Sequence, residues 1–307
     1  MSARPRYGRE LLRRREPSSP VTNVLVQQHP LSIMCAEVNS AEELYLDLLK
    51  LCLTRTGFET TFGQISKRRG LTGLALRSLS NILGASGIEL VRRVEPKMRA
   101  EGSYWPQDAE TMIGLHRLNN LQECVTDVIR SKVPGDLIET GVWRGGACIF
   151  MRAVLKAYRD ESRSVWAADS FEGLPPPNAQ LYPADAGDRH FEQPALRVSL
   201  DEVQANFRKY GLLDDRVNFL VGWFRDTLPT APINQLALMR LDGDLYESTM
   251  DALHSLYPKL SVGGYIIIDD YALPNCRLAV DDFRQKFGIS DDVKKIDWTG
   301  IYWRRGK

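Results

Sequence analysis

The 307-residue sequence lacks the cysteine patterns that disulfide frameworks and zinc sites require. Its five cysteines include no C-x-x-C pair and no cysteine–histidine pattern with the spacing of zinc ligands, which argues against a zinc site. A low, odd number of cysteines fits a reducing compartment, where buried thiols behave as small apolar side chains.

Long apolar runs and an excess of one charge are also missing. No apolar run approaches the ~18 residues of a membrane-spanning helix, and the arginine-rich start is not followed by the hydrophobic core of a signal peptide. The 40 Lys and Arg residues nearly balance the 39 Asp and Glu residues, which gives no general reason to expect nucleic acid or a membrane as partner. We therefore expect a cytoplasmic protein that binds neither.

Two segments precede the main part of the chain. Residues 1–38 begin with six arginines in the first 15 positions, and we expect a disordered basic tail there, with a nucleic-acid or membrane tether as the alternative. Residues 39–106 predict a helical extension. Its strongest helix, residues 41–54, places leucines on one face and has Asn39-Ser40 as a cap. Weaker helical patterns follow at residues 74–83 and 88–94.

From about residue 107, helical patterns alternate with short apolar runs, which is typical of a parallel sheet covered by helices on both faces. We predict strands at residues 136–139, 164–169, 216–222, 236–242, 264–269, 294–298 and 301–304, and helices at 111–130, 147–158, 200–210, 248–260 and 279–287. The fold class is therefore α/β, with a doubly wound, seven-stranded, mostly parallel sheet whose last strand is reversed. Ligands of such sheets bind outside the carboxyl ends of the strands.

The first predicted strand runs into a glycine-rich turn, ETGVWRGG (139–146), followed by a helix. Glycine permits a positive φ and a close approach of ligand to backbone. The turn has neither the G-x-G-x-x-G nor the P-loop spacing, which disfavours a pyrophosphate or triphosphate ligand. Acidic Glu139 instead suits a ligand with an ammonium group or free hydroxyls. The alternative is a helix entry that is merely rich in glycine.

The tips of the next two strands favour a nucleoside ligand. The second strand ends in Asp169 and Ser170, where a carboxylate can accept both hydroxyls of a ribose. The third ends in Gly222, Trp223 and Phe224, an aromatic pair on which an adenine ring can stack. A nucleoside without phosphates that carries an amino-acid tail fits all three tips, and S-adenosylmethionine is such a molecule.

Carboxylates gather after the fourth and fifth strands, at Asp242, Asp244, Asp269 and Asp270. Their mutual repulsion is costly without a cation, and oxygen ligands with no nearby His or Cys suit Mg²⁺. Such an ion can lower the pKa of a substrate hydroxyl while a carboxylate takes the proton. The alternative is that Asp269 and Asp270 cap a loop. We expect Asp244 to lie outside the metal shell and to support the following helix.

These motifs resemble the macrocin O-methyltransferase family, whose members include the mycinamicin and novobiocin sugar O-methyltransferases. The resemblance extends from residue 107 to 305, and is carried by GDLIETGVWRGGACIFMRAVL (135–155), WAADSFEGLPPP (166–177), MRLDGDLYEST (239–249) and YPKLSVGGYIIIDDY (257–271). It implies a class I methyltransferase domain over residues 107–307 that uses S-adenosylmethionine and Mg²⁺ to methylate a hydroxyl of a sugar on a glycosylated natural product.

Carried over residue by residue, the resemblance puts the metal on Asp242, Asp269 and Asp270, with Asp242 also the general base. The implied cofactor residues are Thr111, Glu139, Gly141, Asp169, Ser170, Gly222, Trp223 and Phe224. We interpret the long, proline-rich stretch 175–197 as a lid, within which His190 and Tyr182 are candidates to touch the sugar.

Two other functions stay open at this point: an O-methyltransferase of a catechol or other small non-sugar acceptor, and a nucleoside-binding protein without turnover. The intact carboxylates argue against the second. The sequence leaves open the acceptor, the methylated position, the roles of residues 1–38 and 60–100, and whether the chain forms a homo-oligomer.

Overall fold

The computed structural model describes residues 40–58, 62–64, 71–84, 86–88, 91–104, 106 and 108–306. The predicted basic tail, residues 1–38, lies outside these ranges. Among the described residues, no helix is both long enough and apolar enough to cross a membrane.

A seven-stranded sheet forms the centre of the molecule, with strand order β5-β4-β3-β6-β7-β9-β8. Its strands are β3 (Asp136–Thr140), β4 (Val165–Asp169), β5 (Val217–Val221), β6 (Leu236–Leu241), β7 (Leu260–Ile268), β8 (Lys294–Lys295) and β9 (Ile301–Arg304). The strands β3 to β7 pair in parallel, whereas β9 is antiparallel to β7 and β8. The predicted doubly wound sheet with a reversed final strand is thereby confirmed.

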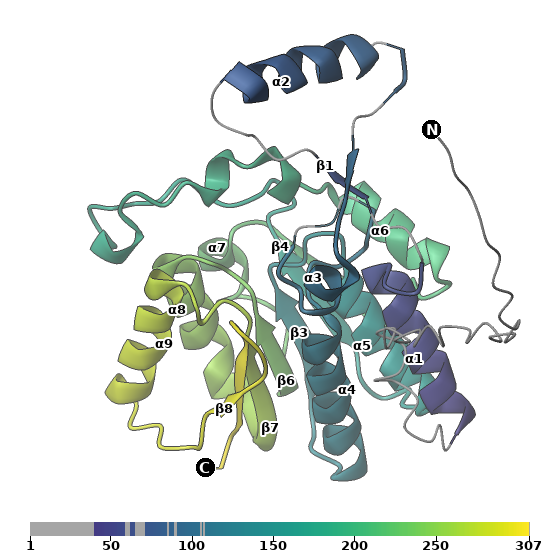
Figure 1. Cartoon of the computed structure of the whole chain (residues 1–307). Helices are drawn as coiled ribbons and strands as arrows, with labels where there is room; N and C mark the ends of the chain where they lie inside the picture. The colour runs from purple at the N-terminus through teal and green to yellow at the C-terminus, as the bar shows by residue number, and fades with distance from the viewer. Residues whose placement is uncertain are drawn as a thin grey trace, which may run out of the picture.

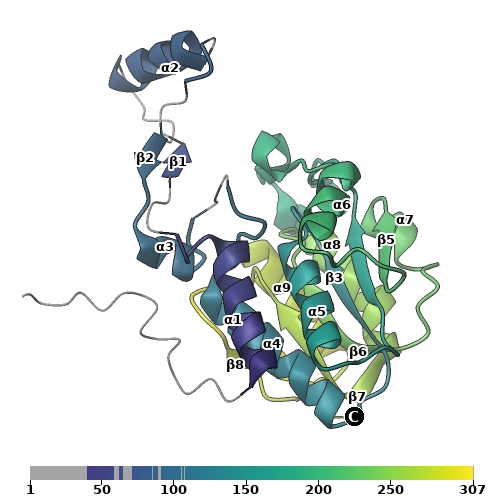
Figure 2. The ribbon, with the colours of Figure 1, turned by 90° about the vertical axis from the view of Figure 1, so that its right-hand side faces the viewer.

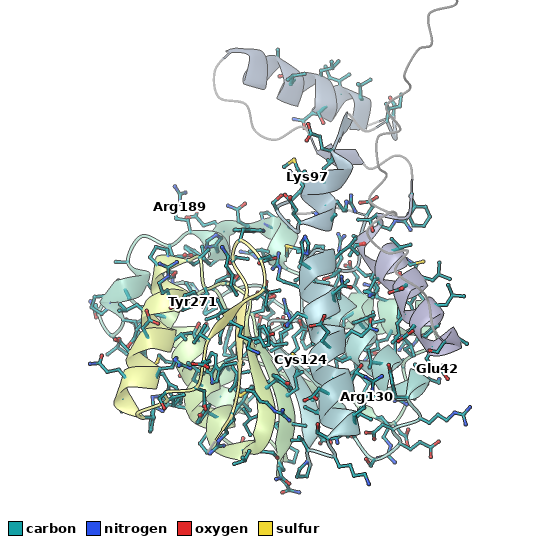
Figure 3. All side chains as sticks on the ribbon, turned by 60° about the horizontal axis from the view of Figure 1, so that its bottom comes forward. Glu42, Lys97, Cys124, Arg130, Arg189 and Tyr271 are labelled. Carbon is teal, nitrogen blue, oxygen red and sulfur yellow. The ribbon has the colours of Figure 1, made fainter. Side chains whose placement is uncertain are left out.

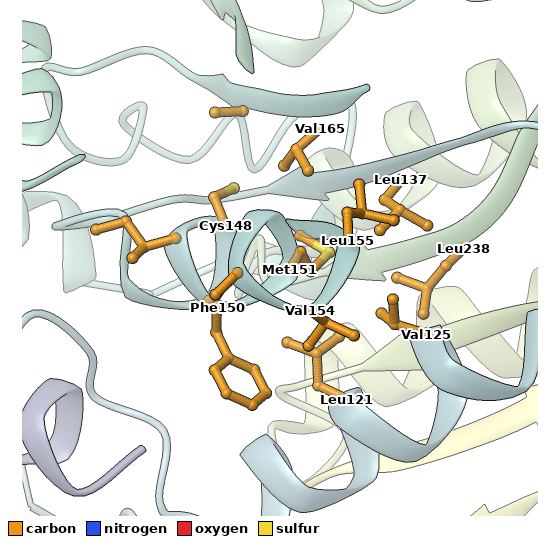
Figure 4. Close-up of a cluster of buried hydrophobic side chains, with 14 of the residues drawn as sticks. Leu121, Val125, Leu137, Cys148, Phe150, Met151, Val154, Leu155, Val165 and Leu238 are labelled. Carbon is orange, nitrogen blue, oxygen red and sulfur yellow. The ribbon is translucent and has the colours of Figure 1, made fainter. Parts of the chain in front are cut away.

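Helices cover both faces of this sheet (Figure 1). They are α4 (Leu115–Arg130), α5 (Gly146–Ala157), α6 (Leu200–Lys209), α7 (Phe224–Thr227), α8 (Tyr246–Leu256) and α9 (Pro274–Lys286). Apolar side chains of α4 and α5, among them Leu121 and Val154, pack on Leu137 of β3 and Leu238 of β6 (Figure 4). The opposite face buries Leu253 of α8 and others of α8 and α9. Burying both faces shields the parallel strands from water, and most of their side chains are apolar.

The N-terminal extension consists of α1 (Ala41–Thr54), β1 (Phe62–Gln64), α2 (Leu71–Gly84), β2 (Val91–Arg93) and α3 (Pro96–Ala100). Helix α1 begins at the predicted cap, because Ser40 Oγ accepts from Glu43 N at 3.2 Å. It buries Leu46, Leu49 and Leu53 in the core beside α4 and α5, whereas α2 and the β1–β2 pair stand away from the body (Figure 2).

Several predicted elements differ from the observed ones; β7 and α9, for example, begin four and five residues earlier than predicted. The helix predicted at residues 88–94 is wrong: Val91–Arg93 form β2, which pairs antiparallel with β1, and backbone pairing has overridden a weak helical pattern. The helix predicted from residue 111 begins at Leu115, so Thr111 lies in the preceding loop. The strand predicted at 294–298 keeps only Lys294 and Lys295, since Asp297 turns the chain by accepting from the N–H groups of Thr299 and Gly300.

The strand order reverses at β3, so the tips of β3 and β6 bound the crevice where ligands of such sheets bind. The two tips approach closely: Asp242 N donates to Thr140 O at 2.9 Å. Gly141 has a φ of 84°, and a Cβ there would lie 1.7 Å from the carbonyl oxygen of Asp242. Only glycine fits this position.

Candidate active site

Two adjoining cavities open at the carboxyl edge of the sheet. The β4–β5 cavity is lined by Asp169, Ser170, Trp223 and Phe224, among others. The β6–β7 cavity is lined by Thr111, Glu139, Asp269 and Asp270, together with Arg117, Arg240 and Trp298. The two share Met112, Gly141, Trp143, Leu196, Asp242 and Asp244. Among the predicted site residues, Gly222 is not one of the described residues that line either cavity. Its N–H donates to Asp169 O at 2.9 Å.

Main-chain N–H groups hold the Asp169 carboxylate at the tip of β4. Its Oδ2 accepts from Val142 N at 2.7 Å and more weakly from Trp143 N at 3.4 Å. Its Oδ1 accepts from Phe171 N at 2.8 Å and from Ser170 Oγ at 3.4 Å. Burial raises the pKa of Asp169, although the backbone hydrogen bonds favour its charged form. The side chain is therefore fixed between the turns after β3 and β4.

The loops after β3, β4 and β6 each hold one non-glycine residue at positive φ. These residues are Trp143 at 47°, Phe171 at 58° and Asp244 at 55°. Such conformations cost free energy and persist where the surrounding structure enforces them, often at functional sites. Their grouping around the two cavities marks this edge as the functional edge of the sheet.

The proline-rich stretch covers the site as a fixed segment. It contributes Pro175 and Leu196 to the cavity linings, and Trp143 Nε1 donates to the Ala195 carbonyl at 2.8 Å. Buried Asp185, which the sequence analysis did not single out, accepts from Tyr246 N at 2.6 Å and Glu247 N at 3.0 Å and so caps α8.

The two side chains of this segment that were candidates to touch a sugar are not among the described cavity-lining residues. The His190 Nδ1 atom lies 2.9 Å from Asp188 Oδ2, and the Tyr182 ring packs 6.1 Å from that of Tyr246. On the same segment, Arg189 extends from the molecular surface (Figure 3).

Asp242, Asp269 and Asp270 come together after β6 and β7. Each offers a carboxylate oxygen, and the three oxygens lie within 4.8 Å of one another. Burial, followed by the charge of Asp269, raises the pKa of Asp242. Burial, followed by the charge of Asp242, raises the pKa of Asp270 well above its usual value. Like charges in a poorly solvated place resist ionisation, so the group carries negative charge that a cation would relieve.

Asp244 lies beside this group and is not one of its three members. Its N–H donates to Asp270 Oδ2 at 3.4 Å, and its side chain lines both cavities. Burial, followed by the charge of Asp242, raises the pKa of Asp244 to about 7. A carboxylate of this pKa can exchange protons near neutral pH. Asp244 is thus a second candidate base, which its placement in the sequence did not indicate.

Two buried arginines at the site were missed by the sequence analysis. Arg240, in the middle of the apolar strand β6, pairs with Glu139, Asp269 and, at 2.8 Å, Asp242 Oδ2. Arg117 of α4 pairs with Asp269 and, at 2.9 Å, with Asp297. One charged residue within a six-residue strand that is otherwise apolar and wholly buried is the signal that could have revealed Arg240.

Glu139 is fully engaged at the base of the β6–β7 cavity. One carboxylate oxygen pairs with Arg240 and the other accepts from Cys148 Sγ at 2.9 Å. Burial raises the pKa of Glu139 to about 7 despite the nearby guanidinium. An ammonium group of a ligand would meet this carboxylate as an additional partner of an existing ion pair.

The residues fit a hard divalent cation. The donor set consists of carboxylate oxygens alone, and five carboxylates at this edge, those of Glu139, Asp242, Asp244, Asp269 and Asp270, face two arginines. The imbalance is consistent with the raised pKa of Asp242 and of Asp270. Oxygen donors of this kind suit Mg²⁺, Mn²⁺ or Ca²⁺.

The strand order and the ligand crevice at the β3 tip together define a class I methyltransferase. The chain belongs to the macrocin-O-methyltransferase (TylF) family, whose model matches residues 42–305. It is accordingly an S-adenosylmethionine-dependent O-methyltransferase.

Individual relatives agree with this assignment. The chain is 49% identical over 281 residues to a demethyldecarbamoylnovobiocin O-methyltransferase of Streptomyces niveus, covering 90% of this chain and 98% of the relative. It is 58% identical over 207 residues to an 8-demethyl-8-(2,3-dimethoxy-alpha-L-rhamnosyl)-tetracenomycin-C 4'-O-methyltransferase of Streptomyces olivaceus, covering 67% and 79%. The solved structure of the O-methyltransferase NovP superposes with a TM-score of 0.76 at 47% identity, covering 87% of this chain and all of NovP.

Proposed function

We propose that this enzyme transfers the methyl group of S-adenosylmethionine to a hydroxyl of a sugar on a glycosylated natural product, and that Mg²⁺ assists the transfer. The observation that carries the proposal is the group of carboxylates of Asp242, Asp269 and Asp270 in the β6–β7 cavity, of which Asp242 also lines the adjoining β4–β5 cavity. The names of the two relatives, one of which specifies a rhamnosyl-bearing acceptor, support the acceptor class.

The cofactor would occupy the β4–β5 cavity and extend past Gly141. Its ribose hydroxyls would replace the two 3.4 Å contacts of Asp169, from Trp143 N and Ser170 Oγ, which are the weakest that the carboxylate makes. The adenine ring would stack at Trp223 and Phe224, next to the hinge at Gly222. The amino-acid end would lie toward Thr111 and Glu139 in the β6–β7 cavity.

Methyl transfer is an in-line displacement, so the protein must align the acceptor oxygen and remove its proton. Asp242, Asp269 and Asp270 would hold Mg²⁺, which when bound lowers the pKa of a hydroxyl and fixes its direction. Asp242 lines both cavities and therefore stands where a hydroxyl proton can be accepted close to the methyl donor.

The acceptor sugar would enter from the side of the N-terminal extension. Gly102, which follows α3, and Trp298 both line the β6–β7 cavity. Trp298 is 56% exposed, yet its Nε1 donates to Glu101 O at 3.1 Å, which fixes the ring. An anchored, exposed indole offers a flat apolar surface to a sugar ring. We accordingly assign residues 39–106 to covering the acceptor and residues 107–307 to catalysis.

An acceptor panel tests the proposal. The purified enzyme would be incubated with S-adenosylmethionine and Mg²⁺ against demethyldecarbamoylnovobiocin, desmethyl rhamnosyl glycosides and a simple catechol, with mass spectrometry as the readout. Methylation of a sugar hydroxyl that stops in EDTA and resumes with added Mg²⁺ is the expected result. Methylation of the catechol alone would show that the acceptor is not a sugar. Full activity in EDTA would show that the reaction does not need a metal ion.

A further inference from the structure

Arg240 occupies an unusual place, because its cation is buried in the sheet between β3, which carries Glu139, and β7, which is followed by Asp269. Its side chain is only 2% exposed. In the parallel register Arg240 lies beside Glu139 of β3 on one side and Ile267 of β7 on the other. Side chains alternate between the faces of a strand, so Glu139, Arg240, Asp242 and Asp269 all belong to the face that α4 and α5 cover.

The charged residues form a layer at the top of that face. Leu137 and Leu238 precede Glu139 and Arg240 by two positions along β3 and β6, and together with Ile267, which lies beside Arg240, they belong to the apolar core of this face. In the layer itself, one terminal nitrogen of Arg240 donates to Glu139 and to Asp242 Oδ2, and the other donates to Asp269. A single planar guanidinium thus spans the tips of three strands.

Arg117 holds the same group from a second element. It extends from α4, where its side chain is 5% exposed, and pairs with the Asp269 oxygen that Arg240 does not contact. It also donates to Gly102 O at 2.9 Å and so links Asp269 to the N-terminal extension. Both oxygens of Asp269 and one of Asp242 are therefore directed by guanidinium groups.

We propose that Arg240, assisted by Arg117, is a positioning residue of the metal centre, which sets the orientation of Asp242 and Asp269 toward the cation. This inference rests on the proposed metal-dependent function. Arginine suits the task because its rigid fork reaches two carboxylates at fixed angles, whereas a lysine ammonium is a point charge on a flexible stem. Without the fork, Asp242 and Asp269 would each have to be ordered by the ion itself.

The arrangement also links the expected position of the cofactor's amino-acid end to the metal centre. Glu139 lies where the amino-acid end of the cofactor is expected, and it shares a guanidinium nitrogen with Asp242. A ligand that draws Glu139 away from Arg240 would strengthen the remaining bond to Asp242. We therefore expect S-adenosylhomocysteine to tighten cation binding in the wild-type enzyme, and this effect to weaken when the fork is lost.

Lysine substitutions separate positioning from charge, because they keep the cation and remove the fork. The full-length Arg240→Lys and Arg117→Lys variants would be titrated with Mn²⁺, followed by calorimetry and by electron paramagnetic resonance, with and without S-adenosylhomocysteine. Arg152→Lys is the matched control: Arg152 on α5 is a buried arginine that pairs through two nitrogens with Asp214, outside both cavities.

The expected result is an Mn²⁺ dissociation constant raised by at least about 10-fold in Arg240→Lys, as for other groups that orient metal ligands. Arg117→Lys should show a smaller rise and Arg152→Lys none. Wild-type affinity in folded Arg240→Lys and Arg117→Lys would overturn the positioning role alone, leaving the arginines as charge neutralisers. If Arg240→Lys does not fold, Arg117→Lys decides in the same way. A wild-type enzyme that binds no Mn²⁺ would overturn the proposed metal function and this inference together.

Discussion

The two halves of the site hold their carboxylates by different means. In the cofactor half, Asp169 accepts from neutral main-chain N–H groups of Val142 and Phe171. In the metal half, Asp242 and Asp269 accept from the buried guanidinium groups of Arg240 and Arg117. Amide donors fix a carboxylate without cancelling its charge, whereas a guanidinium does both.

The two halves place different requirements on their carboxylates. A ribose brings only hydroxyl groups, so Asp169 needs a fixed direction and no change in charge. A divalent cation brings two charges, and Asp242, Asp269 and Asp270 would bind it in competition with protons. The metal half should therefore respond strongly to changes of charge, and the cofactor half mainly to loss of hydrogen bonds.

The largest effect should follow from removing the charge of Asp242 while keeping its shape. Asp242→Asn loses both a metal ligand and the proposed proton acceptor, so turnover should fall by about 10²- to 10⁴-fold, the usual consequence of losing a general base. Excess Mg²⁺ should not restore it. Steady-state kinetics over a range of Mg²⁺ concentrations provide the measurement, and S-adenosylmethionine affinity should stay near the wild-type value.

Variants of the neighbouring carboxylates distinguish a metal ligand from the general base. Asp269→Asn and Asp270→Asn should be rescued in part by high Mg²⁺, because they mainly weaken ion binding. Asp244→Asn tests the second candidate base, since Asp244 lines both cavities and has a pKa raised to about 7. A severe loss in Asp244→Asn together with an active Asp242→Asn would transfer the base role to Asp244.

The next largest effect concerns the cofactor half. Asp169→Asn keeps one acceptor oxygen for the backbone but loses the charge that a ribose would meet, so S-adenosylmethionine should bind more weakly by about 1–3 kcal/mol. Asp160→Asn is a matched control, because Asp160 also accepts main-chain N–H bonds, from Ser162 and Arg163, outside the described linings of both cavities. Calorimetry that finds equal cofactor affinity in both variants would refute the ribose assignment.

Ligand binding to the metal half should depend strongly on pH, whereas cofactor binding should depend on it less. Carboxylates whose pKa is raised keep their protons to higher pH than usual, so a cation must displace protons from Asp242 and Asp270, whose pKa values are both raised. Mn²⁺ affinity should therefore rise with pH over the range in which Asp242 and Asp270 lose their protons, by up to about tenfold per pH unit for each proton displaced, and level off above that range. The affinity for S-adenosylhomocysteine, measured by calorimetry over the same pH range, should change less. An equal pH dependence of the two affinities would contradict the difference between the metal half and the cofactor half.

The sequence was sufficient to predict most of the sheet and the grouping of the acidic residues. Parallel strands end at one edge, so Asp169, Asp242 and Asp269 had to share that edge once the alternation of strands and helices was recognised. Register and burial could not be read from the pattern. Arg240 lies across from Glu139 only because β3 and β6 are adjacent, although they are far apart in the sequence.

Local sequence patterns also failed to predict features that depend on tertiary contacts. Strand β2 is too short and mixed in composition to be recognised without its partner β1. Asp185 appeared as one polar residue of a long proline-rich stretch, and its role in capping α8 depends on a contact across 61 positions. The length of that stretch predicted a lid over the site, but its anchoring at Asp185 and Trp143 was not predictable.

The smallest effect is expected from a part of the chain that belongs to neither half. Residues 1–36 precede both the described residues and the family match, which begins at residue 42. Deleting them leaves Ser40, the cap of α1, in place, so the melting temperature and the affinities for S-adenosylmethionine and Mn²⁺ should stay unchanged. Leu49→Ala is the contrasting variant, because Leu49 is buried where α1 packs on the body, and it should cost about 2–5 kcal/mol of stability. A truncated enzyme that melts as early as Leu49→Ala, or that loses Mn²⁺ but not cofactor affinity, would show that the arginine-rich segment supports the fold or the metal half.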